Sequence, residues 1–341
     1  LGGGSFRLVG ARTGAEISRN IPTLELHLHI EGAAPPAFIR GLAQEKGINL
    51  SGVFNDDGSY RFENFTQFLR VYEAACTFLT GPEEFGRLTT AVLEQSLEQG
   101  VIYTEAFLSP DFCGGGDVGA WREYMHAMQE AANKQPDIEM RGVITCIRHF
   151  GPDQARTAAR CAAETAGEFI TGFGMGGDEM QGKQGDFVYS FDMAREAGLR
   201  LTTHAGEWGG AESVWQAVRD LRVERIGHGV QAIDDPLLVD HLAEHEIVLE
   251  VCPGSNVALG VYSGWRSHPI ATLRERGVKV TVSTDDPPFF HTTLTEEYDL
   301  LGHHFGWEDE ITREVNVTAA KAAFCDDATR AKLLNALEPE T

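Results

Sequence analysis

Residues 24–32 read Leu-Glu-Leu-His-Leu-His-Ile-Glu-Gly. The part Leu24–Ile30 is a short apolar run that ends near a turn residue, Gly32, and such a run predicts a β-strand. Side chains two residues apart in a strand lie on the same face, so His27 and His29 are expected to point the same way. The segment therefore predicts a strand that ends with two neighbouring imidazoles.

Similar apolar runs recur along the whole chain, and segments with helical periodicity lie between them. Alternating strands and helices predict parallel strands joined by right-handed crossovers. Eight such units predict an α/β fold closed into a (β/α)8 barrel of the TIM type. The other seven predicted strands are Val101–Leu108, Ile138–Ile147, Phe169–Phe173, Leu199–His204, Arg225–His228, Ile247–Cys252 and Val278–Thr284. The clearest predicted helices are 37–43, closed by Gly47, and Ala155–Glu164, Val188–Ala197 and Pro236–Glu244.

Two parts of the chain lie outside the eight predicted strand–helix units. The interval 31–100 is rich in phenylalanine and predicts extra helices inserted after the first strand, while Thr312–Leu337 predicts further helix at the C-terminus. An open doubly wound sheet is the alternative fold, but no G-x-G-x-x-G motif follows a strand, and Gly174–Gly177 leads into acidic residues. We expect one domain over residues 1–341, with residues 1–20 as a flexible N-terminal segment.

Composition limits the classes of partner. The formal net charge of −23 disfavours nucleic acid and anionic membranes, so we expect a small neutral or cationic substrate. The six cysteines form no C-x-x-C pair, which argues against a disulfide scaffold and a cysteine-rich zinc site. No signal peptide and no apolar run of ~20 residues is visible, so the expected location is the cytoplasm. The oligomeric state stays open.

Reactive side chains fall repeatedly at the predicted strand ends. In a parallel barrel, catalytic residues come from the C-terminal ends of strands and the loops that follow. Three imidazoles and a carboxylate from strands one, five and eight make a plausible site for zinc or another divalent transition metal. These four residues are His27, His29, His204 and Asp285, and the acid–base groups beside them are Glu207, His228 and Asp286.

Five segments resemble the adenosine and adenine deaminases of the metal-dependent amidohydrolase superfamily. They occur in the order that is found in that family, and weaker similarity continues through Asn316–Lys321. The segments are Glu25-Leu-His-Leu-His-Ile-Glu-Gly32, Gly174-Met-Gly-Gly-Asp-Glu179, His204-Ala-Gly-Glu207, Arg225-Ile-Gly-His-Gly229 and Ser283-Thr-Asp-Asp-Pro287.

The resemblance implies a role for each matching residue. One zinc ion per chain would be held by His27, His29, His204 and Asp285, and would lower the pKa of a bound water from ~15.7 toward ~7. Glu207 would protonate purine N1, His228 would orient the attacking hydroxide, and Asp285 would help to take its proton. Asp286 would contact N7, and the backbone N–H of Gly177 would contact N3. Asp178 and Glu179 could either support the loop or contact substrate.

Several absences refine this interpretation. Binuclear members of the superfamily use a modified lysine at the end of strand four, but Phe169–Gly174 contains no lysine, which favours one metal. The H-x-E and P-C-x-x-C signature of other zinc deaminases is also missing. Cys252 precedes Pro253 and has no partner cysteine nearby, so it is interpreted as a buried residue without a ligand role.

The substrate expected from the resemblance is adenosine, together with deoxyadenosine, which would be hydrolysed to inosine and ammonia in purine metabolism. Adenosine deaminases commonly carry Asp two residues after the second metal-binding His, where it contacts the ribose 5′-hydroxyl, but this chain has Glu31. The alternative is therefore a deaminase of adenine or of a modified 6-aminopurine. Hydrolysis of another C–N bond, such as a cyclic amide, and an inactive barrel that only binds a purine or a protein are further alternatives.

Overall fold

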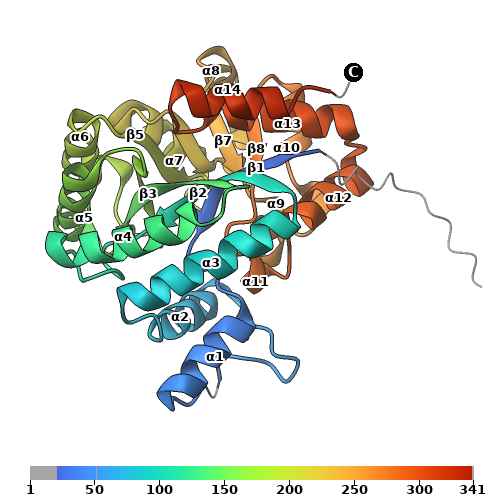
Figure 1. The fold of residues 1–341 in the computed structure, drawn as a ribbon. Coiled ribbons are helices and arrows are strands. Elements are labelled where there is room, and N and C mark those ends of the chain that lie inside the picture. The colour runs from blue at the N-terminus through green and yellow to red at the C-terminus, as the bar shows by residue number, and fades with distance from the viewer. Residues whose placement is uncertain (1–20, 51, 340–341) are drawn as a thin grey trace, which may run out of the picture.

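The computed structural model describes residues 21–50 and 52–339, so the N-terminal segment 1–20 lies outside the described residues. Within them, eight parallel strands pair in chain order. Each strand overlaps one of the predicted apolar runs, and the predicted (β/α)8 barrel is confirmed (Figure 1). The strands are β1 (Thr23–His29), β2 (Val101–Leu108), β3 (Glu139–Ile147), β4 (Ile170–Gly176), β5 (Arg200–Ala205), β6 (Arg225–His228), β7 (Val248–Val251) and β8 (Val280–Val282).

The barrel closes between β8 and β1 through the residues that follow β8. Asp285 pairs with Leu28 in a parallel bridge: its N–H donates to the carbonyl of His27 at 3.2 Å, and its carbonyl accepts from the N–H of His29 at 3.1 Å. The hydroxyl of Ser283 accepts from the N–H of Leu26 and of His27, each at 3.2 Å. Closure of the barrel thus brings Asp285 directly beside the two histidines of β1.

Helices surround the strands and connect most of them, as expected for this fold. The helices that follow strands two to eight are α4 (Val118–Asn133), α5 (Gly151–Thr165), α6 (Val188–Glu196), α7 (Gly210–Gln216), α8 (Pro236–Glu244), α9 (Pro253–Ala258), α10 (Ile270–Glu275) and α11 (Pro287–Phe290). Short helical turns accompany them at Arg148–Phe150, Gln184–Phe187, Ala217–Leu221, Val230–Asp234 and Trp265–Ser267.

The predicted insertion after the first strand consists of α1 (Pro36–Lys46), α2 (Phe65–Cys76) and α3 (Pro82–Glu98). In Figure 1, α1 and α2 lie at the bottom, below the strands, whereas α3 lies next to α4 and packs against it. Phe68 of α2 packs against Phe289 and Phe290 of α11, with ring centroids 5.4 and 5.2 Å apart. The insertion therefore joins the segment after β8 and covers the C-terminal ends of the strands.

The C-terminal part forms α12 (Leu294–Phe305), α13 (Asp309–Ala322) and α14 (Asp327–Ala336). The predicted helical stretch Thr312–Leu337 is interrupted because Asp326 starts a new helix, its carboxylate accepting from the N–H of Thr329. The interruption places backbone groups inside the barrel: the N–H of Phe324 donates to Glu105 at 2.5 Å, and the carbonyl of Ala322 accepts from Arg225 at 3.0 Å. The tail therefore closes the N-terminal end of the barrel.

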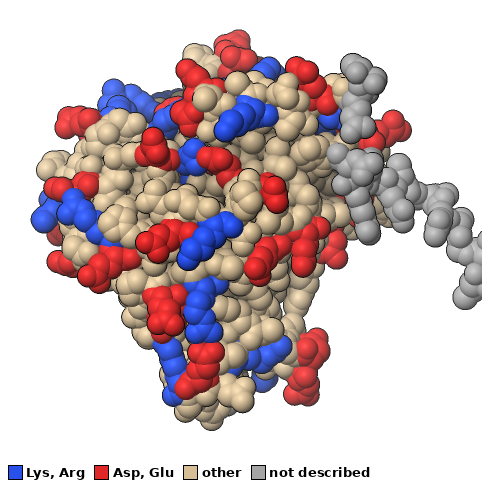
Figure 2. Space-filling model, in the orientation of Figure 1, with Lys and Arg blue, Asp and Glu red and all other residues tan. Residues whose placement is uncertain are grey.

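Charged side chains of both signs are interspersed on the face shown in Figure 2. The acidic residues exceed the basic ones by 51 to 28 over the whole sequence. Among the described helices, none combines the length and the apolar character needed to cross a membrane.

Candidate active site

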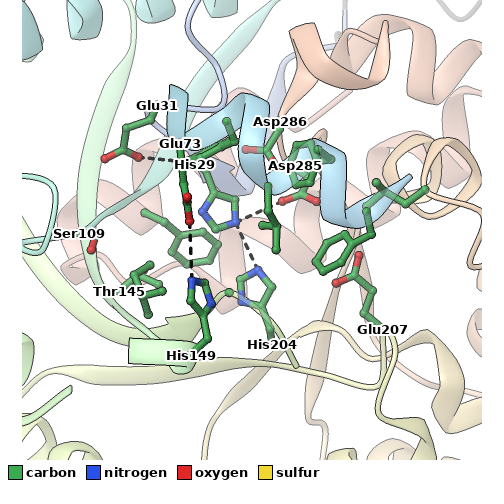
Figure 3. A pocket seen from close by; sticks show the side chains of 18 of the residues that line it. His29, Glu31, Glu73, Ser109, Thr145, His149, His204, Glu207, Asp285 and Asp286 are labelled. Carbon is green, nitrogen blue, oxygen red and sulfur yellow. Dashed lines mark hydrogen bonds and ion pairs between the residues drawn. The ribbon is translucent and has the colours of Figure 1, made fainter. Parts of the chain in front are cut away.

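A cavity lies at the C-terminal ends of the strands, beneath α2 and α11. It has an empty volume of about 770 Å³, which includes its opening to solvent. Its walls contain each residue to which the sequence assigned a role in chemistry or substrate binding, except the fully buried His27. The lining comprises His29, Glu31, Phe65, Phe68, Leu69, Tyr72, Glu73, Phe107, Ser109, Phe112, Thr145, Ile147, His149, Gly177, His204, Glu207, His228, Leu259, Asp285 and Asp286 (Figure 3).

Four side chains at the floor of the cavity converge on one point. His27, His29, His204 and Asp285 offer ligand atoms that all lie within 4.8 Å of one another. Nε2 of His29 is 3.3 Å from Nε2 of His204 and 3.2 Å from Oδ1 of Asp285, and Nε2 of His27 is 3.3 Å from the same oxygen. The structure thus brings together the four residues that the sequence predicted as metal ligands.

The tautomers of two of these histidines suit a cation. Nδ1 of His27 lies 2.9 Å from Glu250, and Nδ1 of His204 lies 2.8 Å from the carbonyl oxygen of Met175. Both partners can only accept, so each Nδ1 carries the proton and each Nε2 presents a lone pair to the centre. Nε2 of His27 is buried and has no hydrogen-bond partner. A buried lone pair without a partner is costly, and a divalent cation would satisfy it.

A buried charge network supports His27 from beneath. Arg225 contacts Glu105 at 2.5 Å and Glu250 at 2.6 Å, and all three side chains are almost fully buried. Although burial raises the pKa of Glu250, the positive charge of Arg225 and the hydrogen bonds from His27 and Thr202 lower it to about 2. Glu250 is therefore an anion that fixes the ring of His27.

Two site residues have a left-handed backbone that is uncommon outside glycine. His228 has φ of 60° and Asp285 has φ of 68°. Such conformations cost roughly 1–3 kcal/mol and persist where the surrounding structure enforces them. The hydroxyl of Ser255 donates to Oδ2 of Asp285 at 2.7 Å, which leaves Oδ1 for the histidine cluster. No pattern in the sequence indicated a role for Ser255.

Glu207 lines the cavity and belongs to a loop that is held in place by hydrogen bonds to Glu179. The carboxylate of Glu179 accepts from the N–H groups of Gly206, Glu207 and Trp208 at 2.6, 3.0 and 2.7 Å. Of the two roles left open for Glu179, support of the loop agrees with these contacts. Asp178 likewise caps its own turn by accepting from the N–H of Met180 at 3.0 Å.

The surroundings of Glu207 favour its neutral acid form. Burial, together with the negative charges of Asp285 and Glu179, raises the pKa of Glu207 well above its ordinary value. Nε2 of His228 lies 3.7 Å from a carboxylate oxygen of Glu207 and 3.7 Å from one of Asp285. The imidazole therefore stands between the acid and the carboxylate at the cluster.

Glu31 and Asp286 also line the cavity. The hydroxyl of Tyr72, on α2, donates to Oε2 of Glu31 at 3.2 Å, whereas Oε1 of Glu31 and Oδ1 of Asp286 are buried without a partner. Gly32 permits this arrangement, because a Cβ there would lie 1.5 Å from Oδ1 of Asp286. Two buried carboxyl oxygens without a hydrogen-bond partner thus lie at the cavity.

Two further lining residues, His149 and Glu73, approach each other, with Nε2 of His149 4.0 Å from Oε1 of Glu73 (Figure 3). Nδ1 of His149 accepts from the N–H of Asp178 at 3.2 Å. Gly177 adjoins this contact with φ of 93°, and a Cβ there would lie 2.8 Å from Nδ1 of His149. Only glycine fits at this position, and its backbone is left open to the cavity.

Cys252 lies closer to the cluster than its sequence context indicated. Its sulfur belongs to a second group of possible ligands, together with His27, His228 and Asp285. Burial, reinforced by the nearby carboxylates, raises the pKa of this thiol well above its ordinary value. The burial of Cys252 agrees with the prediction, and the absence of a ligand role stays a prediction.

A sequence model described as adenosine deaminase matches residues 22–339. The chain belongs to the adenosine deaminase family. The match includes all eight strands and every residue of the cavity. This membership makes the chain a hydrolase that removes the C6 amino group of a purine.

Within the adenosine deaminase family, several named relatives are adenine deaminases. The chain is 45% identical over 323 residues to the adenine deaminase of Rhizobium rhizogenes, covering 93% of this chain and 99% of the relative. The solved adenine deaminase of Arthrobacter aurescens is similar with a TM-score of 0.85, 28% identity, and coverage of 93% of this chain and 98% of that one. An amidohydrolase of Burkholderia ambifaria with bound zinc gives a TM-score of 0.85 and 26% identity, covering 97% and 94%.

Sequence reasoning missed several residues that adjoin the cavity of this family member. Glu250, Asn256 and Tyr72 lie on β7, α9 and α2 and contact residues far away in the chain. Phe65 and Phe68, in the phenylalanine-rich interval 31–100, were not predicted as site residues, but both line the cavity. A buried acid at the end of a central strand, such as Glu250, was the one signal available in the sequence.

Proposed function

We propose that the protein is a zinc-dependent adenine deaminase, which converts the free base and water into hypoxanthine and ammonia. One zinc ion would be held by His27, His29, His204 and Asp285. The convergence of three imidazole nitrogens and one carboxylate oxygen supports this assignment, and the similar amidohydrolase with bound zinc supports the choice of metal. This proposal keeps the predicted chemistry but prefers the alternative substrate, adenine, to adenosine.

A divalent cation at this position would supply hydroxide at neutral pH by lowering the pKa of a water molecule. The chain supplies the remaining groups. Glu207, whose pKa is raised by burial and by the charges of Asp285 and Glu179, would give its proton to N1 as C6 becomes tetrahedral. His228 lies between Glu207 and Asp285, where it would orient the attacking oxygen, and Asp285 would take the proton that is later given to the leaving ammonia.

The oxygen of Glu31 without a hydrogen-bond partner is the observation that supports adenine as the substrate. Free adenine has an N–H in its five-membered ring, whereas adenosine carries the ribose on that nitrogen and has no such donor. Oε1 of Glu31 is buried without a partner, and Oδ1 of Asp286 is equally free. A carboxylate placed to accept from the ring N–H would therefore select the base. The names of the relatives at 42–45% identity agree with this choice.

The two carboxyl groups would divide the five-membered ring between them. Glu31 would accept from the N–H at N9, and Asp286, whose pKa is raised by burial and by the charges of Asp285, Glu207 and Glu31, would donate as the neutral acid to the lone pair of N7. The backbone of Gly177 would contact N3 from the opposite wall, where the missing Cβ permits close approach. Phe65 and Phe68 on α2 would cover the purine with apolar surface. Each of these contacts concerns the base alone, and none requires a sugar.

The test compares adenine, adenosine, deoxyadenosine and N6-methyladenine as substrates of the zinc-loaded protein, with ammonia and the purine product both measured. A site built to hydrogen-bond a substrate N–H discriminates strongly against an analogue without it, so kcat/KM for adenine should exceed that for adenosine roughly 100-fold or more. Comparable or faster turnover of adenosine would overturn the choice of substrate. Unchanged turnover in Glu207→Gln would overturn the assignment of the acid.

A further inference from the structure

Four buried groups form a chain of hydrogen bonds that ends at His228. The N–H of Ile270, at the start of α10, lies 3.2 Å from Nδ1 of His268. Nε2 of His268 lies 3.0 Å from Oδ1 of Asn256, and Nδ2 of Asn256 lies 3.1 Å from Nδ1 of His228. Each of the four residues is at most 3% exposed, so water does not compete for these contacts.

The backbone amide sets the direction of the whole chain of bonds. An N–H can only donate, so Nδ1 of His268 must accept from Ile270 and carries no proton. Burial lowers the pKa of His268 to about 3, so the ring is neutral at neutral pH and its one proton is on Nε2. That proton is donated to Asn256, and the atom that accepts it must be the amide oxygen.

The orientation of the Asn256 amide then fixes His228. With its oxygen toward His268, Asn256 presents its NH₂ group to Nδ1 of His228, which must accept. A neutral imidazole carries one proton, so that of His228 is on Nε2. Nε2 is the atom that faces the cavity, 3.7 Å from both Glu207 and Asp285.

We propose that Asn256 and His268 are positioning residues, which hold His228 in the tautomer that presents an N–H to the attacking oxygen. The inference rests on the proposed function only for its consequence in the reaction. A donor at Nε2 can orient a lone pair of the attacking oxygen, but it cannot accept the proton that this oxygen loses. The role of base therefore falls to Asp285, and the role of His228 is to direct the attack.

The same geometry excludes a merely packing role for the amide. Leucine would fill the space of Asn256, but it would leave Nδ1 of His228 and Nε2 of His268 buried without partners. Aspartate would keep the shape and reverse one bond, because a carboxylate accepts from both rings. In Asn256→Asp, the proton of His228 is expected to move from Nε2 to Nδ1. A tautomer that is wrong in an otherwise intact site lowers kcat severely in other enzymes.

The test uses the zinc-loaded protein labelled with ¹⁵N in histidine. The rings are assigned by loss of signals in His228→Gln and His268→Gln, and ¹H–¹⁵N correlation spectra show which ring nitrogen is protonated. The native protein should show His228 protonated on Nε2, and Asn256→Asp should show it protonated on Nδ1. His228 protonated on Nδ1 in the native protein, or on Nε2 in Asn256→Asp, would overturn the proposal.

Kinetics of adenine deamination give a second readout. Asn256→Asp should lower kcat at least about tenfold while KM changes less than about threefold, because binding groups are untouched. The same change at the exposed Asn335 should alter neither constant. If kcat/KM fell at least about tenfold because KM alone rose, the result would contradict the positioning of His228 by Asn256.

A pair of variants at His268 keeps the proposal testable if Asn256→Asp does not fold. His268→Gln retains a donor toward Asn256 and should keep the Nε2 tautomer of His228, whereas His268→Leu removes the donor and should let both tautomers appear. Identical His228 spectra in these two variants would overturn the proposal. The spectra need no substrate, so they remain decisive even if adenine proves to be the wrong base.

Discussion

The carboxylate of Glu250 on β7 lies 2.9 Å from Nδ1 of His27 on β1. Strand β8 comes between β7 and β1 where the barrel closes. This contact connects the histidine cluster to the buried pair of Arg225 and Glu105. The network stabilises the imidazole in the orientation that leaves Nε2 free. The same contacts therefore link the stability of the barrel to the affinity of the site for a cation.

Glu250→Gln should lower both the stability of the barrel and the affinity of the site for zinc. Removing one partner of a buried ion pair costs ~3–5 kcal/mol, and loss of a group that orients a ligand lowers metal affinity about 10–100-fold. Urea unfolding and zinc content after dialysis against buffered zinc measure the two effects. Glu224→Gln is the matched control, because its pair with Arg200 at 2.6 Å is more than one-third exposed and should contribute only ~0–1 kcal/mol. Equal zinc content in both variants would contradict the role of Glu250.

Glu179→Gln should lower kcat because the loop of Glu207 loses acceptors. Three N–H groups share the two oxygens of this carboxylate, and an amide offers only one oxygen to them. Each buried donor left unsatisfied costs ~1–3 kcal/mol, so unfolding should occur at a lower temperature as well. The neighbouring change Asp178→Asn affects an exposed turn and should leave kcat within about twofold. A normal kcat in Glu179→Gln would show that the loop is held by other contacts.

Tyr72→Phe should reduce activity toward adenine. Its hydroxyl donates to Glu31, and a hydrogen bond to a charged group contributes ~1.5–3 kcal/mol, which corresponds to roughly 10–100-fold in kcat/KM. Tyr60→Phe is a suitable control, because the hydroxyl of Tyr60 donates to the carbonyl of Ala34 at 3.1 Å and the residue lies outside the cavity lining. Steady-state kinetics with adenine compare the two variants. Similar losses of kcat/KM in Tyr72→Phe and Tyr60→Phe would argue against a role of Tyr72 through Glu31.

Gly32→Ala should abolish most activity without unfolding the protein. The added Cβ would lie 1.5 Å from Oδ1 of Asp286 and must displace that carboxylate. A displacement of about 1 Å at a substrate-binding group can reduce the rate roughly 100-fold. Gly41→Ala, on α1 with nothing within 4 Å of the new Cβ, should retain activity and gain ~0.4–1 kcal/mol of stability. Full activity in Gly32→Ala would exclude Asp286 from substrate binding.

The stability of the protein should depend on the charge of Glu297 on α12. Burial raises its pKa to about 8 from the ordinary value of 4.5, although Thr292 and the N–H of Gly254 donate to it. The folded state therefore binds a proton more tightly than the unfolded state, and stability falls as pH rises from about 4.5 to about 8.

Glu297→Gln removes this dependence, because the amide resembles the neutral acid. The variant should match the native protein near pH 4 and exceed its stability by about 1–5 kcal/mol above pH 8. Urea unfolding across this pH range measures the difference. Glu296→Gln, at the exposed neighbouring position, should follow the native curve. A constant difference between Glu297→Gln and the native protein at every pH would contradict the shifted pKa.

Most strands could be read from local patterns, because an apolar run and its turn residues are neighbours in the chain. The run 24–30 and the six runs from residue 101 to residue 252 agree closely with the observed strands. Prediction was weaker where long-range pairing ends a strand. The run Val278–Thr284 yields only Val280–Val282 as β8, since Ser283 and Asp285 bond to β1 instead.

The sequence by itself determined the barrel, the family, and the positions of His27, His29, His204 and Asp285 at strand ends, because period and motif order are properties of the linear chain. Only the tertiary structure decided which groups orient them. The partners of His27 and Glu31 lie 223 and 41 residues away, and closure of the barrel and packing of α2 bring them into contact. No local pattern specifies such pairs, so the tautomers and the free oxygens of the cavity follow from folding alone.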